Sequence, residues 1–480
     1  MKKNGRKIFI LTMLVLFAAV SGFSQGYDIK LNIKNFANKE IYLGHYFADK
    51  TYVKDTTTTS PTGDAEFKGT ETLEPGIYFI VLPTKTIAWE FLMTDDQSFE
   101  MNTDTIDYIG NLKVVGHDQN SKFTEYNAYM RDRSKEMSKF QEVFKADDEA
   151  KKEAIKKDIE ALQLKVQAQW EKYISENPGT LFANIIKAQK YPILPEFEVD
   201  PSISNKDSVL QIYRYYYNKN HWFDNIEWSE VGLLRTNFIY NRLQTFFTQM
   251  VFDPDTVIAE GDRLIKKAEP TPDMFRYLVE YMLNLNYETK RMGMDKVLVH
   301  VGEEYYLSGR ASWVDSARME KIKERVIKTR PNILGAQAKD MKMVTSDNKI
   351  INLFSIKADY IVVAFWEPNC GHCKKTMPVL HDVYTDLKWN KNKKIEVLAV
   401  FTQVKEFDEW QSFIEEKGMT DWINAYDPYG WSGFRDNYDI YSTPTIYLMN
   451  GKFEIIAKRL DVEKIPEFIE SYESFKKTGK

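Results

Sequence analysis

Residues 360–375 read YIVVAFWEPNCGHCKK, and this stretch decides the fold of the C-terminal part of the chain. Tyr360 to Trp366 is an uninterrupted apolar run, which is typical of a central strand covered on both faces of a sheet. A short turn follows, and it leads directly into the two cysteines of the chain, Cys370 and Cys373. We therefore expect a strand, a turn and a helix, with the cysteines placed where the helix begins.

The position of the two cysteines predicts their chemistry. Free backbone N–H groups and the positive end of the helix dipole stabilise an anion at a helix N-terminus. Cys370 is therefore expected to be rich in thiolate and to act as the nucleophile. Cys373, one helical turn further on, is expected to be more shielded and to resolve the mixed disulfide, which releases the partner. Gly371 and His372 lie between them and are expected to tune the redox potential, since positive charge from His372 favours a thiolate.

Two other roles compete for this cysteine pair. A structural disulfide that closes so short a loop would constrain the unfolded chain by only ~2 kcal/mol in the chain-entropy model. A structural zinc ion needs four ligands, and the chain has no second cysteine pair, which leaves only scattered histidines. We therefore expect no metal, and no cofactor beyond the redox-active cysteine pair itself.

A proline forms the second part of the predicted site. Pro444 stands just before the apolar strand Thr445 to Met449, a position that suits a cis bond between Thr443 and Pro444. An ordinary trans proline at a strand start is the alternative. A cis bond would hold backbone groups of Thr443 open beside Cys370, ready to pair with a substrate strand. Thr443, Pro444 and Trp366 are therefore predicted to contact substrate.

Together, the cysteine pair and the strand-leading proline resemble the thioredoxin superfamily. The flanking sequences FWEPNC (365–370) and CKKTMP (373–378) resemble its TlpA/ResA-like bacterial branch, and the resemblance extends over about residues 333–475. It implies a thioredoxin fold with an inserted helix and strand, which residues 406–417 and 422–425 can supply. It also implies a disulfide reductase that receives electrons from a membrane thiol donor and passes them to exported proteins.

Two positions depart from the pattern of that family. Thioredoxins place a buried acid six residues before the first cysteine, where this chain has Ala364. The ResA-like branch has a glutamate three residues after the second cysteine, where this chain has Thr376. The group that accepts the proton of Cys373 and the preferred redox direction are therefore left open. A thiol oxidase or isomerase is the alternative to a reductase, since His372 favours a reactive disulfide.

The remaining chain divides into parts with different periodicity. Residues 1–24 join basic residues to a short apolar run and predict a signal peptide, with an uncleaved anchor as the alternative. Short alternating runs separated by turns predict an antiparallel β-sandwich-like domain over residues 25–116. Amphipathic stretches predict an all-α domain over residues 117–330. Alternating strands and helices predict the α/β thioredoxin fold over residues 331–480.

Charge and hydropathy limit the partners of this multi-domain protein. The 65 basic and 70 acidic residues are mixed along its 480 positions and leave a net charge of −5, which argues against nucleic-acid binding. No apolar stretch after the predicted signal peptide is long enough to cross a bilayer, so we expect no transmembrane segment in the mature chain. The predicted signal peptide and the family resemblance together imply a periplasmic protein. The β and helical domains resemble those that precede TlpA-like modules in Gram-negative bacteria. They leave open a binding protein with an accessory thioredoxin domain.

Overall fold

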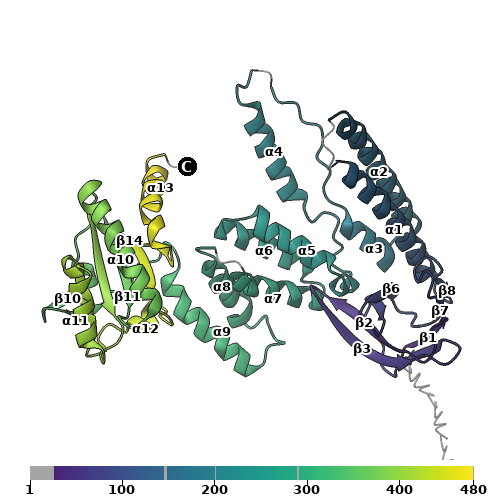
Figure 1. Ribbon diagram of the computed structural model, residues 1–480, viewed down its shortest axis with the longest axis horizontal. Helices are drawn as coiled ribbons and strands as arrows, with labels where there is room; N and C mark the ends of the chain where they lie inside the picture. Colours follow the sequence, from purple (N-terminus) through teal and green to yellow (C-terminus); the bar gives the residue numbers. More distant parts are fainter. Residues whose placement is uncertain (1–25, 145–148, 201, 289–290, 479–480) are drawn as a thin grey trace, which may run out of the picture. The chain divides into compact units, whose positions relative to one another are not determined.

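The computed structural model describes residues 26–144, 149–200, 202–288 and 291–478. The chain divides into two compact units, Met1–Leu243 and Gln244–Lys480, whose helices and strands are drawn in Figure 1. Each unit has a hydrophobic core of its own. The dividing point falls inside the stretch that the sequence predicts to be one helical domain. The predicted signal peptide lies outside the described residues.

The first unit opens with two sheets of short strands. Their strand orders are β4-β1-β7-β8 and β3-β2-β5-β6. The strands are β1 (Asp28–Lys34), β2 (Glu40–Phe47), β3 (Lys50–Thr58), β4 (Asp64–Lys68), β5 (Gly76–Val81), β6 (Ile87–Met93), β7 (Ser98–Asp104) and β8 (Lys113–Val115). Side chains from both sheets share one core, for example Ile29 and Leu31 of β1 with Tyr78 and Ile80 of β5. This shared core confirms the predicted sandwich.

One strand pair departs from the predicted antiparallel arrangement. β1 and β7 run parallel, with Ile29 opposite Phe99 and Leu31 opposite Met101. Neighbouring strands joined by a hairpin must be antiparallel, whereas the strands of the other sheet lie between β1 and β7 in the chain. No hairpin forces these two strands to run in opposite directions, so the sandwich is mixed.

Helices follow the strands of the first unit. They are α1 (Asp118–Phe144), α2 (Glu149–Glu176), α3 (Leu181–Gln189), α4 (Lys206–His221) and α5 (Phe238–Thr245), the last of which reaches the boundary between the units. In α2 the apolar positions Ile155 and Leu162 are buried. The helix ends at Glu176, just before Pro178 and Gly179, as proline and glycine at these positions predict.

The second unit is built around a sheet with the strand order β10-β9-β13-β12-β11-β14-β15. Its strands are β9 (Lys342–Thr345), β10 (Ile350–Asn352), β11 (Tyr360–Trp366), β12 (Ile395–Phe401), β13 (Ile423–Tyr426), β14 (Thr445–Asn450) and β15 (Ile455–Lys458). The helices around the sheet are α10 (Gly371–Thr385), α11 (Phe407–Glu416), α12 (Phe434–Asn437) and α13 (Ile465–Thr478). Here α11 and β13 supply the inserted helix and strand that the family resemblance implies.

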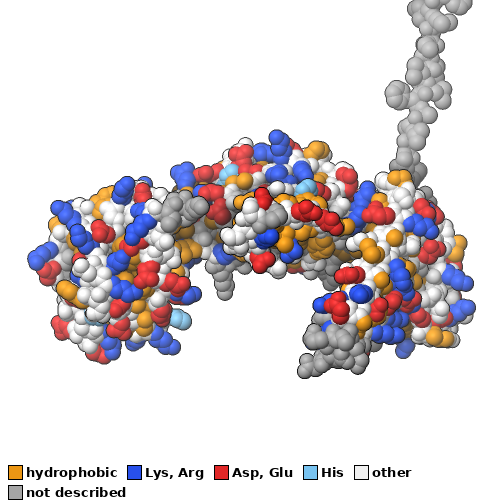
Figure 2. All heavy atoms as spheres, turned by 90° about the horizontal axis from the view of Figure 1, so that it is seen from above, with side chains coloured by type: hydrophobic (Ala, Val, Ile, Leu, Met, Phe, Trp, Pro, Cys, Tyr) orange, Lys and Arg blue, Asp and Glu red, His pale blue; other side chains and the backbone are white. Residues whose placement is uncertain are grey.

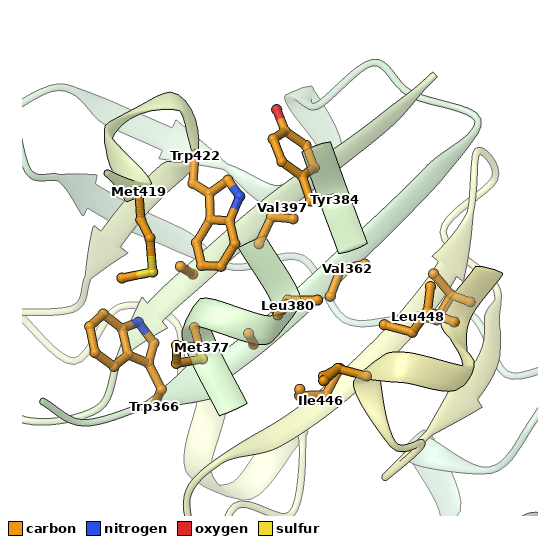
Figure 3. Packing of buried hydrophobic residues seen from close by; sticks show 14 of the residues in the cluster. Val362, Trp366, Met377, Leu380, Tyr384, Val397, Met419, Trp422, Ile446 and Leu448 are labelled. Carbon is orange, nitrogen blue, oxygen red and sulfur yellow. The ribbon is translucent and has the colours of Figure 1, made fainter. Parts of the chain in front are cut away.

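The central strand β11 is buried along its whole length. Val362 and Trp366 face α10, where Met377 packs in the same cluster (Figure 3). Phe365 points to the opposite face, where its ring lies 5.5 Å from that of Phe434. Because alternate residues of a strand point to opposite faces, both faces of β11 are covered, as its continuous apolar run predicts.

Several strand ends lie along one edge of this sheet. Trp366 at the end of β11 is opposite Phe401 at the end of the parallel strand β12, and Phe401 is opposite Tyr426 at the end of β13. Thr445, which begins the antiparallel strand β14, is opposite Phe365. The loops after β11, β12 and β13 and the loop before β14 therefore leave the sheet at the same edge, which we call the carboxyl edge.

Further helices of the second unit precede its sheet. They are α6 (Pro254–Ala268), α7 (Pro272–Glu288), α8 (Asp295–Val301) and α9 (Ser316–Thr329). Lys458 of β15 donates hydrogen bonds to the carboxylate of Asp295 in α8 and, at 2.7 Å, to the carbonyl of Asn332. Both charged side chains are largely buried, so this ion pair fastens α8 to the sheet.

Shorter helical turns connect these elements. The 3₁₀ turns are η1 (Val231–Arg235), η4 (Arg330–Asn332), η5 (Leu353–Ser355), η7 (Met419–Asp421) and η8 (Val462–Lys464), and the π-helical turns are η2 (Phe246–Met250), η3 (Gly302–Leu307) and η6 (Asp386–Asn390).

Basic and acidic side chains are mixed over the visible surface (Figure 2). Among the residues that the structure describes, no helix is both long and apolar enough to cross a bilayer.

Candidate functional site

The two cysteines lie in the first turn of α10, at the carboxyl edge. Cys370 is the N-cap residue, with extended backbone angles of φ −78° and ψ 122°, and Gly371 begins the helix. The first helical hydrogen bond runs from the N–H of Lys374 to the Cys370 carbonyl at 3.0 Å. The preceding N–H groups of the turn have no acceptor inside the helix, so they are free to face a negatively charged sulfur. This placement is the one predicted from the sequence.

The thiol of Cys370 is partly exposed, and its pKa lies below the ordinary thiol value. Partial burial raises this pKa, but a hydrogen bond from the backbone N–H of Cys373, followed by one from the side chain of Thr443, lowers it. The Cys373 thiol and the backbone N–H of His372 act in the same direction. Because these donors outweigh the loss of hydration, Cys370 is the thiol that ionises more readily.

The thiol of Cys373 has the opposite character. Its side chain is fully buried in the cluster beneath α10, and burial raises its pKa to about 12. A hydrogen bond from the backbone N–H of Glu367 opposes the rise, whereas the neighbouring Cys370 sulfur adds to it. Both cysteines are free thiols. The pair therefore consists of one accessible thiol that ionises readily and one buried thiol that stays protonated at neutral pH.

The loop before β14 completes the site. The Thr443–Pro444 peptide bond is cis, as the sequence predicts. The Cys370 Sγ lies 3.3 Å from the Thr443 carbonyl, to which the protonated thiol donates a hydrogen bond. Within the described chain, the backbone N–H of Thr443 donates no hydrogen bond. This N–H and the sulfur therefore stand side by side at the carboxyl edge, where an extended chain can reach both.

Gly371 and His372 lie between the two cysteines, in the first turn of α10. Gly371 and His372 are both exposed to solvent. A Cβ placed on Gly371 would meet no atom within 4 Å, so packing does not demand glycine there. His372 acts on Cys370 through its backbone N–H. Redox tuning by the His372 imidazole and by Gly371 stays a prediction.

Trp366 does not lie where substrate contact was predicted. Its side chain is 0% exposed and lies in the core beneath α10, with its ring 5.3 Å from that of Phe413 (Figure 3). Trp366 shares its face of β11 with the buried Val362, because residues two or four apart on a strand point the same way. The predicted role of Trp366 in direct substrate contact is therefore wrong, and its role is packing.

One acid near the cysteines was not singled out from the sequence. Glu367 lies in the turn between β11 and Cys370, and its carboxylate accepts hydrogen bonds from Thr402 at 2.6 Å and Gln403 at 3.4 Å. Its backbone N–H faces the Cys373 sulfur. Ala364 is fully buried at the position where thioredoxins carry their acid. The sequence feature that could have identified Glu367 is that it is the acidic residue nearest in sequence to Cys370.

Metal-binding side chains do not gather in the described part of the chain. Within it, no group of three or more His, Cys, Asp or Glu side chains is close enough together to hold a metal ion. The two sulfurs of Cys370 and Cys373 can exchange with a disulfide.

Known proteins resemble the C-terminal part of the chain. Residues 358–455 match a family described as Thioredoxin-like. No protein with a curated description matches the chain. The matched range begins before β11 and ends at the start of β15, so it includes both cysteines and the cis-proline loop.

Solved structures also match. A domain of a possible thiol-disulfide isomerase from Cytophaga hutchinsonii is 32% identical, over 31% of this chain and 98% of that chain, with a TM-score of 0.29. A thioredoxin-like protein from Bacteroides caccae is 18% identical, over 59% of this chain and 98% of that chain, with a TM-score of 0.46. A putative thiol:disulfide interchange protein DsbE from Chlorobium tepidum is 20% identical, over 29% of this chain and 96% of that chain, with a TM-score of 0.25.

Proposed function

We propose, from the premise that the C-terminal part of this chain is a thioredoxin-like domain, that the protein is a thiol-disulfide oxidoreductase that acts on exported proteins. The observation that carries the proposal is the asymmetry between Cys370 and Cys373. One sulfur is accessible and has a lowered pKa, and the other is buried with a pKa raised to about 12. A dithiol that exchanges disulfides in two ordered steps needs this difference.

The first step is an attack by the Cys370 thiolate on one sulfur of a partner disulfide. The partner's S–S bond breaks, a bond forms between Cys370 and the attacked sulfur, and the second partner sulfur leaves as a thiolate. The leaving thiolate then takes up a proton. During this step the free N–H of Thr443 is available to pair with the backbone of the partner beside its cystine.

The second step uses the buried thiol. Cys373 gives up its proton, attacks the Cys370 sulfur, and the partner's remaining sulfur leaves as a thiolate and is protonated. The partner has then gained two electrons and two protons, and the Cys370–Cys373 pair has become a disulfide. Burial raises the pKa of Cys373 to about 12 in the reduced pair, so a base or water must take up its proton before the attack. A thiol donor at the membrane would return the pair to its reduced form.

The direction of net electron flow distinguishes the two forms of the proposal. A reductase passes electrons to partners, whereas an oxidase or isomerase works from the disulfide form. The lowered pKa of Cys370 stabilises the reduced pair and so favours the oxidase or isomerase as the second candidate. The reduction potential separates them, because a value near about −270 mV supports a reductase and a value near about −120 mV supports an oxidase.

A trapping experiment tests the proposal itself. In the variant Cys373→Ser, Cys370 can still attack but the mixed disulfide cannot be resolved, so partner proteins should stay attached until a reductant is added. The double variant with Cys370→Ser as well is the matched control, and it should trap nothing. A Cys373→Ser protein that is folded, reacts with no disulfide and traps no exported protein would contradict an exchange function and support a binding protein.

The proposed location is the periplasm, with residues 1–24 removed on export. Expression of the full chain in a Gram-negative host, followed by N-terminal sequencing of the periplasmic extract, tests this location. A mature chain that begins near residue 25 is the expected result. Recovery of the protein with its first residues intact and bound to the membrane would support the uncleaved anchor instead.

A further inference from the structure

A cavity of about 350 Å³ lies in the first unit, which does not contain the cysteine pair. Its walls come from β6, from the loop between β7 and β8, and from α1, which packs against β6 and β8 (Figure 1). Ala88 and Leu112 in these walls are buried, whereas Ile87 is 44% exposed. The cavity is therefore largely apolar, opens to solvent beside Ile87, and has the size of a site for a small molecule.

The backbone of β6 is sealed by α1 at one residue. β6 is the last strand of its sheet, so one side of its backbone has no strand partner. At Leu92 the side chain of Asn120 takes the place of the missing strand. Its Oδ1 accepts a hydrogen bond from the Leu92 N–H at 2.5 Å, and its Nδ2 donates to the Leu92 carbonyl at 2.8 Å. Leu92 is thus a residue whose backbone groups point towards α1.

The same edge is not sealed at the cavity. In an antiparallel sheet, residues two apart point their backbone groups to the same side, so the N–H and carbonyl of Glu90 also leave the sheet towards α1. Thr124 follows Asn120 by about one helical turn of 5.4 Å, close to the roughly 7 Å between Leu92 and Glu90, and it lines the cavity with Glu90. The Thr124 hydroxyl is buried and has no hydrogen-bond partner among the described residues.

The Glu90 side chain adds a negative charge to the cavity. Its Oε1 accepts a hydrogen bond of 2.6 Å from the Tyr46 hydroxyl, and no basic side chain in the described part of the chain pairs with it. Arg131 follows in α1, but it binds the Asp107 carboxylate at 2.6 Å. Burial raises the pKa of Glu90, and the bond from Tyr46 opposes this rise. A carboxylate in such surroundings is costly until a cation joins it.

The walls of the cavity are fixed before any ligand arrives. Asp107 lies in the loop between β7 and β8, and its bond to Arg131 fastens this loop to α1. The same carboxylate accepts a hydrogen bond from the Gly110 N–H at 2.9 Å, and the Thr103 hydroxyl donates to the Tyr108 carbonyl at 2.9 Å. These bonds hold the loop in one shape, so the cavity is a preformed site.

We propose that this cavity binds a small primary ammonium ion that carries a short apolar chain. A primary ammonium group has three N–H donors. The cavity offers three kinds of acceptor to them, namely the carboxylate and the backbone carbonyl of Glu90 and the hydroxyl of Thr124. The apolar walls suit the chain, and a bare metal ion would leave them unused. The site lies outside the thioredoxin-like residues, so the proposal does not depend on disulfide exchange.

The test titrates the full chain with three molecules that share one carbon skeleton. They are 3-methylbutylammonium, the neutral 3-methylbutanol and the anion 3-methylbutanoate, each followed by calorimetry at pH 8, where an alkylamine is protonated. We expect the ammonium ion to bind at one site per chain, about tenfold or more tightly than the alcohol, and the anion not to bind. Equal affinities for the ammonium ion and the alcohol, or no binding of the ammonium ion at millimolar concentration, would overturn the proposal.

Variants assign the binding to the cavity. Glu90→Gln keeps the shape and the acceptor for Tyr46 but removes the charge, so it should weaken ammonium binding about tenfold and leave alcohol binding unchanged. Thr124→Val removes one acceptor and should weaken ammonium binding about threefold, whereas Thr124→Ser keeps the hydroxyl and should bind as the unaltered chain does. Glu100→Gln is the control, because Glu100 is exposed on β7 and does not line the cavity.

The outcomes keep the proposal separate from stability and from the cysteines. Full ammonium affinity in Glu90→Gln would overturn it, as would equal affinities of Thr124→Val and Thr124→Ser. If Glu90→Gln does not fold, which thermal unfolding followed by circular dichroism shows, the two Thr124 variants decide alone. Alkylation of Cys370 should proceed at the same rate in every variant, so a failure here leaves disulfide exchange standing, and a failure of exchange leaves this site standing.

Discussion

The carboxyl edge and the opposite edge of the C-terminal sheet are made from the ends of the same strands, but their polar groups are arranged differently. At the opposite edge Lys393 donates to both carboxylate oxygens of Glu473 at 2.7 Å, and Tyr360 donates to the same carboxylate at 3.1 Å. At the carboxyl edge the Cys370 sulfur is partly exposed and the backbone N–H of Thr443 donates no hydrogen bond within the described chain. One edge is closed by internal pairs, and the other is left open to a partner.

This difference shows that the groups that stabilise the fold and the groups that can react lie at opposite ends of one sheet. Groups that are paired internally stabilise the folded chain, and their donors and acceptors are already occupied. Groups that are left open at the carboxyl edge can bind or react, because the rigid strands behind them keep their positions. Changes at the two edges should therefore have different signatures, in exchange rate at one edge and in unfolding at the other.

The largest expected difference is between the two thiols themselves. With the pKa of Cys370 below its ordinary value and that of Cys373 raised to about 12, their thiolate fractions at neutral pH differ by more than about a thousandfold. Iodoacetamide should therefore modify one cysteine per reduced chain, and peptide mass mapping should assign it to Cys370. As pH falls below the Cys370 pKa the rate should decline tenfold per unit.

Equal modification of both cysteines at pH 7 would contradict the asymmetry on which the exchange proposal depends. The variant Cys370→Ser supplies the control, because its remaining thiol should react only at strongly alkaline pH or after unfolding in urea. Rapid alkylation of Cys373 in that variant would show that its burial is not maintained in solution.

The second-largest effect is a loss of stability in the core, between the two edges of the sheet. Trp366→Ala removes a fully buried ring beneath α10 and should lower the free energy of unfolding by about 3–5 kcal/mol. Urea unfolding followed by circular dichroism measures this loss. The exposed Trp389 is the matched control, and Trp389→Ala should change the free energy by less than about 0.5 kcal/mol. A stable Trp366→Ala protein with impaired peptide binding would restore the substrate role that we have rejected.

A smaller effect is expected where α9 meets the carboxyl edge. Arg325→Gln leaves the buried Asp439 carboxylate without its main partner and releases the Tyr441 hydroxyl. We expect a loss of about 1–3 kcal/mol in unfolding free energy. We also expect no change in the pH profile of Cys370 alkylation, because Arg325 does not contact the Cys370 sulfur. Arg330→Gln removes an exposed pair with Glu303 and should alter neither property.

The smallest effect is expected at the opposite edge. The hydrogen bond from Lys393 holds the pKa of Glu473 below its ordinary value. The pair therefore stabilises the fold above the ordinary carboxyl pKa, and this contribution is lost as pH falls through the lowered pKa. Glu473→Gln should cost about 0.5–1 kcal/mol at pH 7 and nothing at pH 2. Its rate of exchange with glutathione disulfide should equal that of the unaltered chain, and a changed rate would contradict the separation between the edges.

Much of the site could be predicted because its signals are local. An apolar run predicts a buried strand, a cysteine pair directly after it predicts a helix start, and a proline before the next strand suits a cis bond. The prediction for Trp366 was wrong although a local signal was present. Trp366 stands four residues after Val362 and six after Tyr360, so it points to the same buried face of a strand that is covered on both sides.

By itself the sequence determined the order of the three regions, the central strand, the cysteine pair at a helix start and the proline loop, because each of these follows from neighbouring residues. Only the tertiary structure decided which distant loops meet around Cys370. Thr402 and Gln403, which donate hydrogen bonds to the Glu367 carboxylate, lie 35 and 36 positions after Glu367, and their place depends on strand order in the sheet. Strand order is set by burial and backbone pairing across the whole domain, which no local pattern records.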